Sequence, residues 1–446
     1  MIDEKIVLSD ITWGLERETH RIRPDGSIST TLHPAALAKP GFTKDFAESQ
    51  LELVTKPHHS ISETLRELKD LTLIAHKEIG AELLWPFSMP PRLGDENGIT
   101  TARMGNDDTG RLAEMYRRGL ISRYGAARQM ICGVHVNVSF GRELLLWLQR
   151  TAPLSADERT NRTESDGYYL RLMRNMIEDL PYLVTFFGAS PVIESVDTGS
   201  AGRTAFSFRN SPYGYARKEY RPFLELGSVR EHLEGIRRGM ATESLAFSRL
   251  GLVREGKAIQ LNNRIFQKDK EFYAPIRFRR NTSRTESPID AIERKGVEYM
   301  ELRFYDIEPF TPLGVSVDSL NLTHLFLLDD LSRVSARRSN ESLTEILDGA
   351  DDAALSDPLA IRRPFFLGNA LKRLASVGRF AESLGPEYKR AVESYSRALD
   401  RGGESLAART LKKYRASGLA WTQYGASLAE RNRSDLDRLG ASNANS

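Results

Sequence analysis

The feature that most constrains this chain is a polar side that recurs on its predicted β-strands. Four segments place acidic residues, or a histidine beside an asparagine, on one side of an apparent strand: residues 14–18, 45–52, 134–139 and 299–303. Carboxylates are costly to bury unless they pair with cations or bind a metal ion. A fold that collects them on strand faces is therefore predicted to build a pocket for cations, and such a pocket indicates chemistry.

The overall charge is nearly balanced. Of the 446 residues, 63 are Lys or Arg and 60 are Asp or Glu, which gives a formal net charge of +3. This balance argues against a nucleic acid or a membrane surface as a partner. We also expect no obligate protein partner.

Cysteine content and apolar runs bear on the compartment. The single cysteine, Cys132, excludes an internal disulfide and a cysteine-based zinc site. The first five residues lack the basic start and apolar run of a signal peptide. No stretch approaches the roughly 18 apolar residues of a membrane span. We therefore expect a cytoplasmic protein.

Sequence periodicity predicts a mixed, largely antiparallel sheet followed by helices. Residues 134–139 and 297–305 alternate between apolar and polar side chains, as half-buried strands do. Residues 61–79 carry apolar side chains at helical spacing with Ser60 as N-cap, and residues 168–187 also predict a helix. Residues 259–278 are predicted as two strands around a polar turn at 268–270. After about residue 335 the pattern becomes helical.

The acidic segments also have ordinary structural explanations. Glu16 and Glu18 would share a strand face, where they repel each other unless a cation lies between them. Alternatively, they form a solvated face beside neighbouring arginines. Glu52 would face the same way as Gln50 in a strand at 50–55, and a surface position is its ordinary alternative.

His135 and the pair Glu301–Arg303 likewise allow two interpretations. His135 is flanked by two valines and is expected to be buried, either as a hydrogen-bonded core residue or as a metal ligand. Glu301 and Arg303 alternate with apolar residues, so they either form an internal salt bridge or face a pocket together.

The combination of these segments favours a metal-bound nucleotide site. Carboxylates are hard oxygen ligands that suit Mg²⁺ or Mn²⁺, and a histidine among them tolerates Mn²⁺. Several carboxylates around two or three such ions form a cradle for ATP phosphates. The chain carries neither a P-loop nor a Rossmann glycine fingerprint. Arg303 would then be the natural partner of a transferring phosphoryl group.

Other features remain open on sequence alone. A basic cluster is formed by Arg277, Arg279, Arg280 and Arg284. It is either a solvated loop or a contact for nucleotide phosphates. The tyrosines at 116, 215 and 273 have the character of core or rim aromatics. Cys132 has no base beside it in the sequence, so we expect no nucleophilic role for it.

The residue pattern resembles a known family over roughly residues 12–316. The matching segments read GLERET at 14–19, DFAE at 45–48, LWPFSMP at 84–90, YRRGL at 116–120 and RYG at 123–125. They continue with Gln129, GVH at 133–135, Asn137, FGASP at 187–191, YAPIR at 273–277 and YMELR at 299–303. In this collinear order they resemble bacterial glutamate–cysteine ligase (γ-glutamylcysteine synthetase) and the ligase module of bifunctional glutathione-synthesising enzymes.

The resemblance implies an α+β, glutamine-synthetase-like fold, in which a curved, largely antiparallel sheet forms a funnel with helices outside. It implies ATP-dependent ligation of the γ-carboxylate of glutamate to the amine of cysteine through a γ-glutamyl phosphate, the first step of glutathione biosynthesis. Glutamate, cysteine and ATP would be the small-molecule partners. Two or three Mg²⁺ or Mn²⁺ ions would be the cofactors.

The resemblance also implies roles for individual residues. The positions where the family holds its divalent cations are Glu16, Glu18, Asp45, Glu52, His135 and Glu301. The positions of its cysteine pocket are Phe46, Tyr116, Leu120, Gln129, Arg209, Tyr215 and Tyr273. Arg303 would lie beside the reacting phosphoryl group, and Glu301 would act with it in catalysis. Arg209 and Tyr215 rest on a looser match, FRNSPYGY at 208–215.

The chain departs from the family pattern in two places, which keeps other functions open. Residues 194–209 diverge, and the strand at 135–138 carries valines in place of aromatics. A γ-glutamyl ligase with another amine acceptor is one alternative. A catalytically silent relative that acts as a binding subunit is another.

The change of pattern near residue 335 divides the chain in two. We expect residues 1–335 to form the catalytic ligase core. Residues 336–446 would form a helical portion packed on the same domain. Residues 441–446 are expected to fray, because terminal residues have few contacts to hold them.

Overall fold

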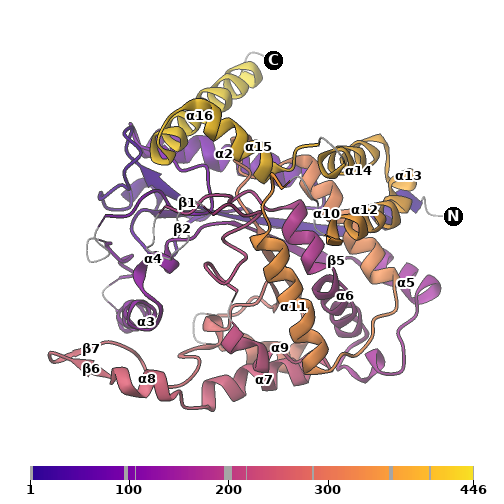
Figure 1. Ribbon diagram of the computed structural model, residues 1–446. Coiled ribbons are helices and arrows are strands. Elements are labelled where there is room, and N and C mark those ends of the chain that lie inside the picture. Colours follow the sequence, from indigo (N-terminus) through magenta and orange to yellow (C-terminus); the bar gives the residue numbers. More distant parts are fainter. Residues whose placement is uncertain are drawn as a thin grey trace.

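A seven-stranded sheet runs through the centre of the molecule in the computed structural model (Figure 1). The structure describes residues 4–94, 99–105, 107–194, 203–216, 218–283, 286–360, 365–400 and 403–444. In spatial order the strands are β2 (Phe42–Lys44), β3 (Gln50–Val54), β1 (Ile11–Ile22), β5 (Val134–Phe140), β9 (Tyr299–Tyr305) and β8 (Ile276–Arg279), and β4 (Leu83–Leu84) also pairs with β1. Every pairing is antiparallel.

One face of this sheet belongs to the main hydrophobic core. Alternate residues along the strands, among them Leu53 on β3, Val136 on β5 and Leu302 on β9, are fully buried there. Burying a side chain of this size contributes about 1.5–3 kcal/mol. The period of two residues therefore fixes the register, because a shift by one residue would send the polar side chains into the core.

Two long helices lie against the core. They are α6 (Glu164–Phe186), whose N-terminus carries a capping box at Thr163, and α10 (Val317–Ser332). Each is buried over most of its length, and α6 also contacts β8 and β9. The helix α2 (Ile61–Glu78) contacts β1 and β3, and Ser60 caps it by accepting a hydrogen bond from the Glu63 N–H, as the sequence predicts.

The remaining helices surround this centre. They are α1 (Glu4–Leu8), α3 (Asp108–Tyr124), α4 (Ala126–Gln129), α5 (Arg142–Thr151), α7 (Val229–Ala241), α8 (Leu245–Leu250), α9 (Pro288–Lys295), α11 (Asn340–Leu355), α12 (Phe365–Val377), α13 (Ala381–Leu384), α14 (Pro386–Leu399), α15 (Leu406–Ser417) and α16 (Trp421–Ala444). A small hairpin of β6 (Val253–Arg254) and β7 (Lys257–Ala258) extends with α8 from the lower left of Figure 1.

The predicted pair of strands at 259–278 is wrong in its first half. Only residues 276–279 form a strand, and residues 269–271 form a short 3₁₀ helix. Side chains and scattered backbone hydrogen bonds to residues 239–252 satisfy the backbone of the first half in place of a strand ladder. Arg123 donates to the carbonyls of Asn262 and Ile265, and the Leu261 N–H donates to the side chain of Gln267.

The predicted α+β class, with a largely antiparallel sheet and outer helices, is confirmed. The division at residue 335 stays a prediction. The helix α16 reaches Ala444, and the last two residues of the expected frayed tail lie outside the described residues. Among the described residues, no helix is long and apolar enough to cross a membrane.

Candidate active site

The strand register brings acidic side chains together on the second face of the sheet. Glu18 on β1 lies opposite Glu52 on β3. Glu16, two residues earlier on β1, lies opposite His135 on β5. Directly opposed residues of antiparallel strands point to the same face. The period-two alternation therefore brings these side chains together on one face of the sheet, as the sequence predicts.

Asn137 and Glu301 extend this polar row. The two residues lie opposite each other in the pairing of β5 with β9. Asn137 Nδ2 donates to Glu16 Oε1 at 2.9 Å. His135 Nδ1 lies 3.2 Å from Glu16 Oε2 and 3.5 Å from Glu301 Oε1. Three strands thus contribute to one compact group.

His135 occupies an irregular point of β5. The register with β9 shifts between Val134 and Val136, and such bulges re-aim side chains beside active sites. Its buried Nε2 has no hydrogen-bond partner among the described residues and lies 3.6 Å from Glu18 Oε1. Burial, with the charge of Arg303, lowers the pKa of His135 to about 4. The imidazole is therefore neutral at pH 7 and keeps a lone pair for a cation.

Three of these side chains are arranged to surround one ion. Glu16, Glu52 and His135 each offer a ligand atom, and these atoms lie within 4.8 Å of one another. Two carboxylates and an imidazole form a donor set for Mg²⁺ or Mn²⁺. The residues present therefore fit a divalent cation.

Glu18, Asp45 and Glu52 keep raised pKa values although the charge of Arg303 opposes the shift. Glu16 differs, because burial is outweighed by its hydrogen bond with His135 together with nearby positive charge, so its pKa is lowered. Burial, reinforced by the neighbouring Glu16, raises the pKa of Glu18 to about 7. Burial and the charge of Glu18 raise the pKa of Asp45 to about 6. The pKa of Glu52 is raised well above its ordinary value by burial and by the surrounding carboxylates. An added cation would relieve this repulsion.

Glu301 differs because arginines lie beside it. Burial alone would raise the pKa of Glu301, but Arg303 and Arg279 lower it far below its ordinary value. Arg303 Nη1 donates to Glu301 Oε1 at 2.5 Å, and Arg279 Nε lies 3.6 Å from Glu301 Oε2. The two residues therefore form the internal salt bridge, and this pair borders the acidic cluster.

The basic cluster is divided between two environments. Arg277 lies opposite Glu301 on the polar face and Arg279 contacts Glu301. Arg280 points elsewhere and donates to the Gly296 carbonyl. Arg284 lies outside the described residues. Neither Arg277 nor Arg279 was among the predicted site residues, although the alternation of residues 276–279 opposite β9 carries the signal.

A pair of tyrosines lies next to Arg303. Tyr215 and Tyr273 stack with ring centroids 4.2 Å apart and planes inclined by 18°. The Arg303 guanidinium lies 4.9 Å from the centre of the Tyr273 ring. The buried Tyr273 hydroxyl has no hydrogen-bond partner among the described residues. This stack gives the cluster an aromatic wall.

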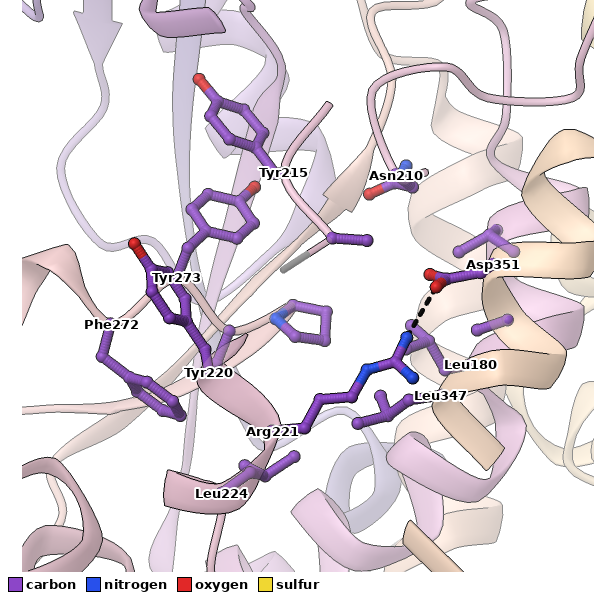
Figure 2. A pocket seen from close by; sticks show the side chains of 15 residues that line it. Leu180, Asn210, Tyr215, Tyr220, Arg221, Leu224, Phe272, Tyr273, Leu347 and Asp351 are labelled. Carbon is purple, nitrogen blue, oxygen red and sulfur yellow. Dashed lines mark hydrogen bonds and ion pairs between the residues drawn. The ribbon is translucent and has the colours of Figure 1, made fainter. Parts of the chain in front are cut away.

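Behind the stack is a small apolar cavity, shown in Figure 2. Its volume is about 70 Å³, and Leu180 and Leu347 line its helical side. Arg221 and Asp351 form an ion pair of 2.6 Å across its edge, drawn as a dashed line in Figure 2. This volume is below the range of about 300–1,000 Å³ that is typical of ligand pockets.

Arg209 is buried next to the tyrosines without an acidic partner. Its Nη1 donates to the Arg303 carbonyl at 2.5 Å, and its Nε and Nη2 have no hydrogen-bond partner in the described part of the chain. A Cβ on Gly133 would lie 2.4 Å from this guanidinium, so the glycine makes room for it. The two free nitrogens suit a ligand carboxylate.

The other predicted pocket residues lie around α3 and α4. Phe46 and Leu120 pack in one small apolar cluster. Lys270 Nζ lies 4.5 Å from the centre of the Tyr116 ring. The Gln129 carbonyl accepts a hydrogen bond from Gln50 Nε2 on β3. Arg117 links this side to the acids, since its Nε donates to the Asp45 carbonyl at 2.9 Å.

Two polar residues near the site have structural surroundings. Glu48 is buried and accepts from Lys44 Nζ and from the N–H groups of His33 and Arg103, so it is neither exposed nor part of the acidic cluster. Cys132 is fully buried, and burial raises the pKa of its thiol well above the ordinary value. This agrees with the expectation that Cys132 is not a nucleophile.

Comparison with known proteins places this chain in the class of ATP-dependent ligases. The sequence model of the family described as glutamate-cysteine ligase matches residues 2–351. The chain therefore belongs to the glutamate–cysteine ligase family. The glutamate–cysteine ligase of Proteus mirabilis is 36% identical, over 95% of this chain and 86% of its own. That of Clostridium acetobutylicum is 34% identical, over 78% of this chain and 77% of its own.

Solved structures share the architecture. A crystal structure of glutamate–cysteine ligase from Francisella tularensis in complex with AMP superposes with a TM-score of 0.86 at 26% identity, over 96% of this chain and 89% of that one. A bifunctional glutathione synthetase from Pasteurella multocida, at 24% identity, has the same fold with a TM-score of 0.79. This chain spans 53% of that longer protein.

Proposed function

We propose that the chain uses ATP to join the γ-carboxylate of glutamate to the amine of cysteine. The reaction would pass through a γ-glutamyl phosphate and would be the first step of glutathione biosynthesis. The observation that carries the proposal is the group of buried and half-buried carboxylates whose pKa values stay raised although Arg303 lies beside them. Its members come from separate strands, so the fold assembles a repulsive arrangement that a metal-bound nucleotide would stabilise. Family membership supports the choice of substrates.

The residues proposed to hold two or three Mg²⁺ or Mn²⁺ ions are Glu16, Glu18, Asp45, Glu52, His135 and Glu301. When bound, such ions neutralise the phosphate charges of ATP and the charge that develops during phosphoryl transfer. The buried His135 Nε2 and Glu301 Oε2 atoms, which lack hydrogen-bond partners in the described chain, support these roles.

Arg303 is proposed to act on the transferring phosphoryl group. Its guanidinium is held between the Glu301 carboxylate and the Tyr273 ring, which fixes its direction before substrate binds. A preorganised cation opposite developing negative charge is an effective form of catalysis. Glu301 orients Arg303 through their hydrogen bond and completes the catalytic pair.

The tyrosine side of the site is proposed to bind the amine acceptor. Arg209 would pair with its carboxylate through the nitrogens that lack partners. Tyr215 and Tyr273 would cover the reacting groups, and the residues around α3 and α4 (Phe46, Tyr116, Leu120 and Gln129) would complete the pocket. Excluding water matters here, because water would hydrolyse the activated carboxyl group before the amine attacks it.

An assay of ADP release tests this function. The purified chain is incubated with ATP, glutamate and each of a panel of amino acids, with Mg²⁺ or with Mn²⁺. We expect turnover that requires the metal and glutamate and is greatest with cysteine. Greater turnover with another amine would favour the alternative of a different acceptor, for which the divergent residues 194–209 are the motivation. Absence of metal-dependent turnover with every pair would favour a catalytically silent binding protein.

We further propose that the partners are limited to small molecules and that the protein is cytoplasmic. The balanced charge argues against nucleic acid and membrane surfaces, and no obligate protein partner is expected. Residues 1–335 would supply the whole site, because every proposed site residue precedes residue 304. The later helices would support that core.

A further inference from the structure

A larger cavity lies away from the acidic face of the sheet. It has a volume of about 490 Å³ and lies among the end of α6, the connection between β9 and α10, and the helices α14 and α15. Phe186, Phe310 and Leu399 are among its apolar lining residues. This volume is within the range of small-molecule sites, which combine apolar walls with a few polar groups.

One group of polar lining residues is cationic. Arg409, on the first turns of α15, lies with its guanidinium 4.6 Å from the centre of the Phe310 ring. Its buried Nε has no hydrogen-bond partner, and no ion pair of Arg409 or of Arg397 is recorded within the described ranges. The Phe310 ring packs against Arg409 without neutralising it, so the cavity wall carries a positive charge that could attract an anion.

The connection between β9 and α10 supplies the anionic lining groups. Glu308 is buried, and the hydrogen bonds recorded for its carboxylate, from the Ser316 N–H and from the hydroxyls of Ser316 and Ser319, are all accepted by Oε1. Asp318 lines the same cavity and has no recorded ion pair in the described chain. Burial raises the pKa of Glu308, although the Ser316 and Ser319 hydrogen bonds and the charge of Arg409 partly oppose this shift.

These opposite charges line one space without pairing. No contact within 4.0 Å joins Arg409 or Arg397 to Glu308 or Asp318 among the described residues, although unlike charges at a cavity wall attract each other strongly. A ligand with one anionic and one cationic group could satisfy both kinds of side chain at once. The carboxylates of the same cavity would repel a purely anionic ligand, and the arginines would repel a purely cationic one.

We propose that this cavity is a second binding site, for a small zwitterion of amino-acid to short-peptide size that pairs with Arg409 at one end and with Glu308 and Asp318 at the other. The site is separate from the acidic face of the sheet, since its residues come from the β9–α10 connection and from the helices α14 and α15. The proposal does not depend on the chemistry of the acidic face.

Calorimetric titration of the full-length protein tests this proposal. The zwitterionic probes are L-glutamate, glycylglycine and γ-L-glutamylglycine, and the single-charge controls are succinate and putrescine. All titrations use Glu301→Gln as the background, so that turnover does not contribute heat. Arg409→Gln and Asp318→Asn are tested on this background. Arg415→Gln, an exposed arginine on the same helix, is the matched control.

We expect at least one zwitterion to bind, and both Arg409→Gln and Asp318→Asn to weaken it about tenfold or more, which is the loss of one charge-assisted contact. Arg415→Gln should leave the affinity unchanged. Circular dichroism verifies that each variant is folded, and Asp318→Asn, at a partly exposed position, serves if Arg409→Gln is not. Three results would overturn the proposal: no zwitterion binds, the binding is indifferent to both substitutions, or succinate or putrescine binds as tightly.

Discussion

Two buried carboxylate sites in this protein show opposite solutions to the same cost. Glu158, just before α6, is fully buried and accepts hydrogen bonds from Arg171 Nε and Nη2, the Ser335 hydroxyl and the Ser155 N–H. Burial opposes ionisation, but these donors lower its pKa to about 2. On the sheet, burial raises the pKa of Glu18 to about 7. At Glu158, protein groups alone therefore stabilise the buried charge.

The difference teaches how to separate a structural charge from a functional one. Both kinds of site are buried, so burial alone does not distinguish them. At Glu158 the protein supplies the partners, and breaking the arrangement should cost stability. At Glu18 and Glu52 it leaves the carboxylates in mutual repulsion, and completing the arrangement requires a ligand. Substitutions at the two sites should therefore have opposite signatures.

The largest effect is expected on activity, at the sheet site. Glu301→Gln and Arg303→Ala should each lower kcat by about 10²–10³-fold or more, because each removes preorganised charge from the reacting phosphoryl group. The melting temperature should also fall, because each substitution leaves a charge of the Glu301–Arg303 salt bridge without its main partner, so kcat is taken per folded molecule. Steady-state kinetics and thermal unfolding measure the two effects. Turnover near the wild-type rate in either variant would contradict the site assignment.

The opposite signature is expected at the helical site. Arg171→Ala should lower the free energy of unfolding by about 3–5 kcal/mol, because it leaves the Glu158 carboxylate buried without its main partner. Activity per folded molecule should stay close to wild type. Urea unfolding and a kinetic assay at low temperature provide the measurements. A loss of turnover without a loss of stability would break the comparison.

The pH dependence of stability should differ in sign between the two sites. Folded protein holds the Glu18 proton up to a pKa of about 7, above the ordinary value of 4.5, so this group makes the wild type less stable as pH rises between those values. Glu18→Gln removes this loss. In EDTA, its free energy of unfolding should exceed that of the wild type by up to about 3 kcal/mol at pH 7.5 and by little at pH 4.5.

Glu158 should behave in the reverse manner. Its lowered pKa contributes stability above pH 4.5, which is lost as pH falls toward 2. The matched control is therefore Glu158→Gln, which should be less stable than the wild type at pH 5 and approach it at pH 2. If the stability gained by Glu18→Gln did not grow with pH, the folded protein would already stabilise the charged form of Glu18, and its pKa would not be raised.

The smallest effects are expected at the more accessible arginines of each region. Arg279, 34% exposed beside Glu301, should contribute to nucleotide binding, so Arg279→Gln should raise KM for ATP about tenfold without changing stability. Arg338, 42% exposed and paired with Glu178, is the control, and Arg338→Gln should cost less than about 1 kcal/mol of stability and leave KM unchanged. Equal KM values for the two variants would exclude Arg279 from the site.

The sheet site was largely predictable because strand alternation is a local signal. The period of two in residues 134–139 and 299–303 placed His135 and Glu301 on one face, and the register of the fold aligned these residues with Glu16. The roles given to these residues stay predictions. Arg279 stayed open between a solvated loop and a phosphate contact, because its position depends on β8 pairing with β9, which residues 276–279 alone do not reveal.

The helical site was not predictable in this way. Glu158 and Arg171 are separated by a loop and a helix start, and their contact depends on how α6 packs against the segment before it. The irregular segment at 259–267 was misassigned for a related reason. Its backbone partners include distant side chains such as Arg123 and the backbone of residues 239–252, and no local pattern reveals them.

The central claim, that the acidic face is completed by a divalent cation, is tested most directly by titrating the metal-free protein with Mn²⁺ at pH 7 in a calorimeter, using two buffers of different ionisation enthalpy. We predict that Mn²⁺ binds and releases protons, since Glu18 and Glu52 have raised pKa values, and that Glu52→Gln weakens binding at least tenfold while Glu158→Gln does not. Absence of binding, or binding that is indifferent to Glu52→Gln, would contradict the account.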